Sequence, residues 1–371
     1  SKFCNCLLEA GMPLARMTVI IPTLHPQIFA SVYVWREDDR EVKIYLEAHD
    51  ILSQPKFADS PFAPIIRGAG GVRRRLEGDN PKLDFPVVKE LHEEGATDYV
   101  AMPFKFSDGQ INVISMTSFG EGGFGTTHLG RIYEVLPTLG RLFEVHAQRR
   151  TAVNLLETYL GRHTGQRVMD GQVKHGDGEH IHAVIWFCDL RDSTALSGSM
   201  DQSDYLLLLN RFFHCMAGSI MENNGEVLRF IGDAVLAIFP ISNSTDQLWE
   251  SATGTPEACR RAIKAARMVA ERIAIANERH SDQPSLKYGI GLHLGDVTYG
   301  NIGIPERLEF TVIGPAANKA ARVESMTKEL DEIVVISSEF VDGCPGKFVS
   351  KGSHVLKGVE GKHELYALPS E

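Results

Sequence analysis

Polar and apolar residues alternate in five short segments of the first 127 residues, as they do in half-buried β-strands. These segments are rich in β-branched and aromatic side chains, which favour strands. A short amphipathic helix over residues 85–96, closed by Gly95, separates the third segment from the fourth. The pattern predicts a small α/β domain over residues 1–127, with strands at 14–24, 30–38, 42–49, 98–106 and 109–119.

Beyond this domain the apolar positions recur every three or four residues, which is the period of an α-helix. Pro137 predicts a kink in this helix or a break into two helices, and Gly161 ends it. Such a helix either packs on its own domain or pairs with the same helix of a second chain, and both alternatives fit the pattern. We therefore assign residues 128–174 to a helical linker that ends in a polar, glycine-containing boundary loop.

Residues 175–371 contain both apolar strand patterns and long amphipathic helix patterns. An apolar strand ending at Asp189 is followed by a long helix, a hairpin that turns at residues 231–234, a second long helix, and a segment at 285–303 that we expect to form a strand, turn and return. The first half of this order is βαββαβ, a ferredoxin-like split unit. The predicted fold class of the chain is therefore α+β.

Composition narrows the class of protein. The chain has 371 residues and a formal net charge of -10, which argues against a nucleic-acid binder held by its overall field. No apolar run has the length of a transmembrane helix. The six cysteines are scattered and contain no CxxC pair, so we expect reduced thiols in a cytoplasmic protein.

Two aspartates stand where chemistry is expected. Asp189 ends an apolar strand, and Asp233 lies in the turn of the following hairpin, so a shared sheet would bring their carboxylates together. Two such carboxylates repel each other unless a cation lies between them, and hard oxygen ligands suit Mg²⁺ or Mn²⁺. The alternative is that each aspartate merely stabilises its own turn, and the spacing alone leaves both interpretations open.

The residues around the aspartates resemble a known family. The segments FCDLRDST, LRFIGDAVLAIF, FTVIGPAANKAARV and LKGVEG occur in this order between residues 187 and 361. Together they resemble the catalytic domain of the class III nucleotidyl cyclases, the common adenylate and guanylate cyclases. The resemblance covers about half of the chain, and the motifs lie on four separate segments.

The resemblance implies a role for each matching position. It implies two metal ions per active site, bound by Asp189, Asp233 and the carbonyl of Leu190. Asn318 and Arg322 would stabilise the transition state, and Lys357 would contact the terminal phosphates. Phe187 anchors the strand end, and the turn Leu190–Thr194 would wrap the triphosphate. The substrate-binding residues expected in this turn are Arg191, Asp192, Ser193 and Thr194, and Asp192 is expected to shape the turn.

The resemblance also implies which base is selected. Arg229 stands where adenylate cyclases usually have lysine, and Thr311 fits the adenylate pattern of one bacterial subgroup. Guanine needs a hydrogen-bond acceptor at the first position, and a guanidinium only donates. ATP is therefore the expected substrate. The alternatives are GTP as substrate, or a nucleotide-binding signalling module without turnover.

The family's active site lies between two catalytic domains, and this chain carries one copy of each implied residue. A homodimer with two equivalent sites is therefore expected. Cyclases of this type usually carry a regulatory domain, and residues 1–127 resemble a GAF-type sensory domain. We expect an unidentified small molecule or other signal to act there.

Overall fold

The computed structural model describes residues 1–171, 174, 176, 178–242 and 253–369. The chain divides into two compact units, Ser1–Leu155 and Leu156–Glu371. The predicted linker, residues 128–174, is thus shared between them, and residue 175, the expected start of the second domain, lies outside the described residues. None of the helices formed by the described residues is long and apolar enough to cross a membrane.

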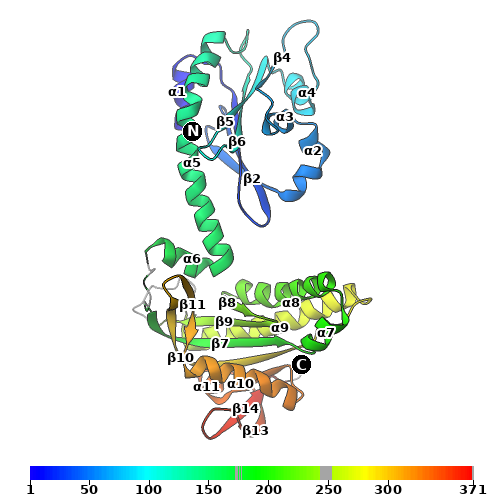
Figure 1. Ribbon diagram of the computed structural model, residues 1–371, viewed down its shortest axis with the longest axis vertical. Helices are drawn as coiled ribbons and strands as arrows, with labels where there is room; N and C mark the ends of the chain where they lie inside the picture. Colours follow the sequence, from blue (N-terminus) through cyan, green and yellow to red (C-terminus); the bar gives the residue numbers. More distant parts are fainter. Residues whose placement is uncertain (172–173, 175, 177, 243–252, 370–371) are drawn as a thin grey trace. The chain divides into compact units, whose positions relative to one another are not determined.

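The first unit contains a six-stranded antiparallel sheet in the order β3-β2-β1-β6-β5-β4 (Figure 1). The five predicted strands are present, and the structure adds a short strand, β4, and an N-terminal helix, α1. The strands are β1 (Arg16–Pro22), β2 (Ile28–Arg36), β3 (Val42–Ala48), β4 (Val72–Arg75), β5 (Asp98–Lys105) and β6 (Ile111–Ser118). The helices are α1 (Lys2–Glu9), η1 (His49–Ser53), α2 (Pro55–Ala58), α3 (Phe62–Ile66), α4 (Pro86–Glu93) and α5 (Thr126–Leu160).

The two faces of this sheet differ in chemistry. On β1, Met17, Val19 and Ile21 point into a core that also contains residues of α1 and α5. The intervening residues Arg16 and Thr18 point to the other face, where α3 and α4 pack over part of the sheet. The second face is therefore only partly filled with apolar side chains, and a cavity remains there.

Pro137 does not divide α5, which runs through it as one helix of 35 residues. Ile132, Leu136 and Gly140 are buried on one side of this helix and lie on both sides of the proline in sequence. Packing at these four-residue intervals holds both halves of the helix against the sheet, which compensates for the hydrogen bond that proline cannot donate. The break that we considered does not occur.

The second unit is built on an eight-stranded sheet, with β7 and β10 at its centre. Its strand order is β13-β14-β12-β10-β7-β9-β8, and β11 pairs with the far part of β10. The strands are β7 (Gly178–Leu190), β8 (Glu226–Ile231), β9 (Ala234–Ile241), β10 (Tyr288–Ile304), β11 (Arg307–Ile313), β12 (Val334–Ser337), β13 (Val349–Val355) and β14 (Lys362–Ala367). The helices are α6 (Arg162–Met169), α7 (Ser193–Ser199), α8 (Gln202–Glu222), α9 (Thr255–Arg279), α10 (Pro315–Glu329) and α11 (Ser338–Gly343).

The expected βαββαβ order is present as β7, α8, β8, β9, α9 and β10, with the short α7 before α8. One detail of the prediction was wrong, because residues 285–303 do not form a strand that turns back. Tyr288–Ile304 is a single strand, and the return strand is β11. β10 pairs with β7 without interruption from Tyr288–Leu190 to Gly300–Gly178, so the glycines that suggested a turn lie in an extended ladder.

Helices cover both faces of this sheet: α8 and α9 lie on one side and α10 on the other (Figure 1). Strand β7 alternates accordingly. Val184, Trp186 and Cys188 join the core under α8 and α9, whereas Ala183 and Ile185 join the core that includes α10. Asp189 has the same parity as Ala183 and Ile185, so the strand's periodicity turns it toward the α10 side.

The contact between α10 and β10 depends on glycines. A Cβ atom at Gly291 would lie 2.4 Å from the backbone nitrogen of Glu324 and 2.7 Å from the carbonyl oxygen of Ala320. Both neighbours are helix backbone and cannot move aside as a flexible side chain would. The close approach therefore requires glycine, and it sets the distance of α10 from the sheet.

We predict that Gly291→Ala lowers the free energy of unfolding by about 1–3 kcal/mol, because α10 must lift from β10. Gly198→Ala is the control, since a Cβ atom there meets nothing within 4 Å and alanine favours the helix. Urea unfolding of the two variants measures the difference. Equal stability of Gly291→Ala and the unmodified protein would show that the helix is not held this closely.

Candidate active site

Asp189 and Asp233 come from two neighbouring strands of the central sheet. Asp189 is the penultimate residue of β7, and its register partner on β9 is Ala234, the residue directly after Asp233. Asp233 lies in the tight turn between β8 and β9, where Gly232 adopts a left-handed conformation with φ 63°. The sheet register therefore brings the two carboxylates to one edge, and they interact directly.

The pair carries negative charge with little compensation. Burial, followed by the neighbouring charge of Asp233, raises the pKa of Asp189 to about 6. Among the described residues, Asp189 makes one ion pair: Nζ of Lys328 lies 3.8 Å from Oδ2 of Asp189, and this lysine is more than half exposed. An exposed lysine at this distance offsets only a small part of the repulsion. The site therefore favours an additional cation.

The donor set fits a hard divalent ion such as Mg²⁺ or Mn²⁺. Two carboxylates and the backbone carbonyl of Leu190 are oxygen donors, and Mg²⁺ in proteins commonly takes one or two carboxylates with water and phosphate oxygens. Within the described part of the chain, no group of three or more histidine, cysteine, aspartate or glutamate side chains forms a metal cage. The ligands that complete such a site would thus come from substrate and solvent.

The turn after β7 is shaped by its backbone. Asp192 is left-handed, with φ 62°, and is the N-cap residue of α7. Asp192 and Thr194 are exposed and Ser193 is half-buried, so this turn is accessible. Phe187 is partly buried against the core on the α10 side. These residues lie where the triphosphate was expected, beside Asp189.

Arg191 differs from the other residues of the turn. Its Nη2 donates to the carbonyl oxygens of Thr327, at 3.0 Å, and Glu332, at 2.7 Å, and its backbone N–H donates to the carbonyl of Lys287. The guanidinium thus ties the turn to the end of α10. The predicted binding of substrate by Arg191 stays a prediction, and in this structure its Nη2 and its backbone N–H donate to main-chain carbonyl groups.

Asn318 and Arg322 lie one helical turn apart on the outer face of α10. Both are exposed, whereas Ala320, Val323 and Thr327 are buried against the sheet. Lys357 is exposed in the loop after β13, next to Leu356, which is buried with Val323 in one cluster. Asn318 and Arg322 are therefore on the solvent side of α10, and Lys357 lies in a loop that Leu356 anchors to the cluster under the same helix.

The two residues expected to select the base lie near each other, together with a third residue that the sequence did not suggest. Nη2 of Arg229 is 2.9 Å from Oε1 of Glu309. Thr311 is buried, and its hydroxyl has no hydrogen-bond partner among the described residues. Glu309 and Thr311 are two apart on β11 and so share a face, which is the signal that could have identified Glu309.

Glu324 is a second residue that sequence reasoning missed. It is buried on α10, and burial, with a contribution from Asp189, raises its pKa to about 7. Lys328, one turn further along α10, is the lysine that approaches Asp189. The four-residue spacing puts both side chains on the helix face toward the aspartates. They extend the charged surroundings of the site into α10.

Residues 178–370 match the profile of the adenylate and guanylate cyclase catalytic domain, which is more than half of the chain. The chain belongs to this cyclase family. The matched range covers the whole central sheet and each position discussed above, from Phe187 to Lys357.

Curated relatives include an adenylate cyclase of Anabaena cylindrica, 32% identical over 193 residues, which are 50% of this chain and 36% of that protein. A protein of Mycobacterium tuberculosis is 32% identical over 221 residues, 60% of this chain and 35% of that protein. The chain thus spans about a third of the length of these relatives. A solved bacterial light-regulated adenylyl cyclase shares the fold at 18% identity, with a TM-score of 0.53, over 73% of this chain and 85% of that one.

We predict that Asp189→Asn stabilises the cyclase without metal at pH 7, by on the order of 1 kcal/mol given the partly exposed position. The raised pKa means that the folded state binds a proton that the unfolded state has lost. The unfolded carboxyl has the ordinary aspartate pKa of about 4. The stability that this group contributes is therefore fully present below about pH 4, and it is lost as the pH rises through the folded pKa of about 6. Urea unfolding in a chelating buffer at several pH values tests this.

Asp192→Asn is the control, because Asp192 is exposed and asparagine also tolerates its left-handed conformation. The advantage of Asp189→Asn should disappear below about pH 4, where the ordinary carboxyl group is protonated in both states. A variant that is no more stable than the unmodified chain at pH 7 would contradict the uncompensated charge.

Proposed function

We propose that this cyclase is an adenylate cyclase that converts ATP to 3′,5′-cyclic AMP and pyrophosphate. The observation that carries the proposal is the Asp189–Asp233 pair at the edge of the sheet, inside a domain that belongs to the cyclase family. In this reaction the ribose 3′-hydroxyl oxygen forms a bond to the α-phosphorus. The bond between the α-phosphorus and the oxygen that bridges it to the β-phosphorus breaks, pyrophosphate leaves, and the hydroxyl proton passes to solvent.

Asp189, Asp233 and the carbonyl of Leu190 would hold two divalent ions, Mg²⁺ or Mn²⁺. Such ions lower the pKa of a bound hydroxyl and neutralise the leaving pyrophosphate. The raised pKa of Asp189 supports the assignment, because a carboxyl pair under repulsion has the most to gain from a cation.

The remaining roles follow from side-chain chemistry. Arg322 would donate to the phosphoryl oxygens as negative charge develops on them, and Asn318 would orient the ribose. Lys357 would contact the terminal phosphates as a point charge. The exposed turn at Asp192, Ser193 and Thr194 would offer backbone N–H groups to the triphosphate.

We propose that the active unit is a homodimer with two shared sites. Asn318 and Arg322 are exposed on the outer face of α10 and have no side-chain partner among the described residues. Asp189 lies at the end of β7, and Asp233 lies in the turn between β8 and β9. A second copy related by two-fold symmetry would bring each α10 face to the other chain's aspartates. Each site would then need residues from both chains.

The shared site predicts complementation. Asp233→Ala and Arg322→Ala should each lower turnover by about 100-fold or more when assayed alone. Mixing equal amounts and allowing subunit exchange should restore about a quarter of the unmodified activity, because half of the dimers are mixed and each of these has one intact site. Product chromatography after incubation with ATP and Mg²⁺ or Mn²⁺ measures recovery.

The same assay with the unmodified chain tests the proposed activity itself. Cyclic AMP from ATP supports it, and cyclic GMP from GTP alone would replace it with the guanylate alternative. If neither nucleotide gives a cyclic product with either metal, the remaining alternative is a nucleotide-binding signalling module that does not turn over substrate. Activity without complementation would retain the cyclase and overturn the shared site.

ATP is favoured because Arg229 offers donors to the base, and adenine N1 is an acceptor. Thr311 is consistent with the bacterial subgroup of adenylate cyclases noted above. Glu309, however, pairs with Arg229 and is an acceptor within reach of the same region. It is the observation that keeps GTP as a second candidate, because the donors on guanine require an acceptor.

We predict that Glu309→Gln lowers turnover of GTP relative to ATP by about tenfold, because an amide is a weaker acceptor than a carboxylate and no longer holds Arg229 by charge. Glu306→Gln is the matched control, since Glu306 is exposed in the turn between β10 and β11. Parallel assays with both nucleotides give the ratio. An unchanged ratio would show that Glu309 does not act on the base.

We also infer that the first unit is regulatory and GAF-like, and that the catalytic half is a ferredoxin-like split unit. The six-stranded antiparallel sheet and the strand order β10-β7-β9-β8 support these assignments. Most of α5 belongs to the first unit, where Ile132 and Leu136 pack against the sheet, and the helix extends past Leu155, the last residue of that unit. A signal bound in the first unit would therefore act through this helix.

A further inference from the structure

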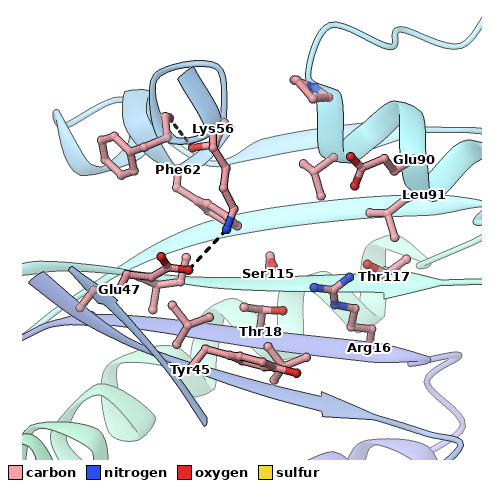
Figure 2. Close-up of a pocket in the computed structure, with 18 of the residues that line it drawn as sticks. Arg16, Thr18, Tyr45, Glu47, Lys56, Phe62, Glu90, Leu91, Ser115 and Thr117 are labelled. Carbon is pink, nitrogen blue, oxygen red and sulfur yellow. Dashed lines mark hydrogen bonds and ion pairs between the residues drawn. The ribbon is translucent and has the colours of Figure 1, made fainter. Parts of the chain in front are cut away.

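The first unit contains a cavity of about 670 Å³ between its sheet and the helices of the second face. This volume lies within the range of about 300–1,000 Å³ that small-molecule sites occupy. Strands β1, β6, β2 and β3 line its floor, and residues of η1, α2, α3 and α4 contribute to the walls. Figure 2 shows part of this lining.

The floor of this cavity is polar where a sheet interior is normally apolar. Thr18 lies opposite Ser115, and Arg16 lies opposite Thr117, in the register of β1 and β6. The three hydroxyl-bearing residues are at most 6% exposed, although they stand on the two middle strands of the sheet. A buried threonine or serine side chain costs stability unless its hydroxyl is hydrogen-bonded.

Two of these three hydroxyl groups have no hydrogen-bond partner among the described residues. Thr18 and Thr117 make no side-chain hydrogen bond to any other described residue, and the hydroxyl of Ser115 has the buried phenol of Tyr99 as its neighbour. The hydroxyls of Thr18 and Thr117 are therefore available to a ligand in the cavity that these residues line. Figure 2 shows Thr18, Ser115 and Thr117 on adjacent strands below the cavity.

Arg16 adds a positive charge to the same floor. Burial lowers the pKa of Arg16, and Arg36, its cross-strand partner, lowers it further, while Glu94 partly opposes this. Arg16 has no ion pair within 4 Å and no side-chain hydrogen bond in the part of the chain that the structure describes. A half-buried guanidinium without a counter-ion favours an anion that can bind it through two N–H groups.

The other parts of the cavity restrict what that anion can be. Phe29, Phe57 and Phe62 line the end of the cavity away from Arg16, because Phe29 follows the far end of β1 in the strand register. Beside Arg16 and Thr18 the apolar lining comes from Val34, the register partner of Thr18, and from Leu91 (Figure 2). Lys56 is paired with Glu47 at 3.6 Å, so this lysine is not free for a ligand. Further carboxylates, Asp38, Asp59 and Glu90, also line the cavity and are exposed to solvent. They would repel a polyanion such as a triphosphate.

We propose that this cavity binds a small organic anion whose single carboxylate or phosphate group lies against Arg16 and the hydroxyls of Thr18 and Thr117, and whose apolar body contacts the neighbouring Val34 and Leu91. Binding itself does not require cyclase activity. Its regulatory meaning rests on the function proposed above, for which it specifies the chemical class of the signal.

Titration calorimetry of the full chain with three matched aromatic probes tests this site. Benzoate and phenyl phosphate carry an anionic group on the same ring, and benzamide is the neutral counterpart of benzoate. At least one anion should bind in the millimolar range or more tightly, and at least about tenfold better than benzamide. The better of the two anions identifies the headgroup as carboxylate or phosphate.

Arg16→Met keeps the length and the apolar stem of the side chain, and it should abolish the preference for the anion over benzamide. Thr18→Val should weaken anion binding by a smaller factor. Arg131→Ala, an exposed arginine on α5 outside the cavity, is the matched control for loss of one charge. Far-ultraviolet circular dichroism confirms that each variant is folded before titration.

Equal binding of benzamide and the anions, no binding of either anion, or unchanged anion binding by folded Arg16→Met would each overturn the proposal. Because calorimetry needs no catalysis, these outcomes are distinguishable from a failure of the cyclase assay. Anion binding in a chain that makes no cyclic nucleotide would support the site and contradict only its regulatory consequence.

Discussion

The antiparallel pairing of β7 with β10 determines most of the geometry of the catalytic unit. It extends without interruption from Tyr288–Leu190 to Gly300–Gly178 and places both strands at the centre of the sheet. The end of β7 then carries Asp189 to the sheet edge, and the glycines of β10 allow the backbone of α10 to approach closely. The site and the helix that bears Asn318 and Arg322 are thus positioned by one ladder.

The charge at this edge is a compromise between stability and the proposed function. Partial burial and the neighbouring Asp233 raise the pKa of Asp189. Both effects disfavour the charged carboxylate, so they oppose folding at neutral pH. The protein retains the pair in a well-packed sheet whose neighbouring residues, Cys188 and Leu190, are fully buried. The rigid surroundings therefore hold the two carboxylates together without metal, and binding of a cation would relieve the repulsion.

The sheet of the first unit also carries polar side chains at a position where apolar packing would stabilise it more. Its middle strands are apolar toward α1 and α5, but on the opposite face they present Arg16, Thr18 and Thr117. Polar side chains on the central strands lower the apolar packing available to that face, and a cavity replaces it. Both sheets thus carry polar groups that the described residues do not fully compensate, namely the carboxylates at the edge of one and the hydroxyls of Thr18 and Thr117 on the other.

The sequence by itself determined the element order of the catalytic half and the identity of its family, because strand and helix periods are local and the four motifs are contiguous. It also indicated that Asp189 and Asp233 could meet, since a strand end and a hairpin turn are local features. It did not locate the turn after β10, because glycine suggests a turn wherever no partner strand is considered. The unbroken course of α5 through Pro137 likewise depended on packing that lies far away in the sequence.

Only the tertiary structure decided the partners of individual side chains. The sequence could not indicate that Nη2 of Arg191 donates to the carbonyls of Thr327 and Glu332, more than 130 residues further along the chain. The pairing of Arg229 with Glu309 and the approach of Lys328 to Asp189 depend in the same way on strand register and helix placement. Periodicity states which face a residue occupies, whereas its partner depends on which distant element covers that face.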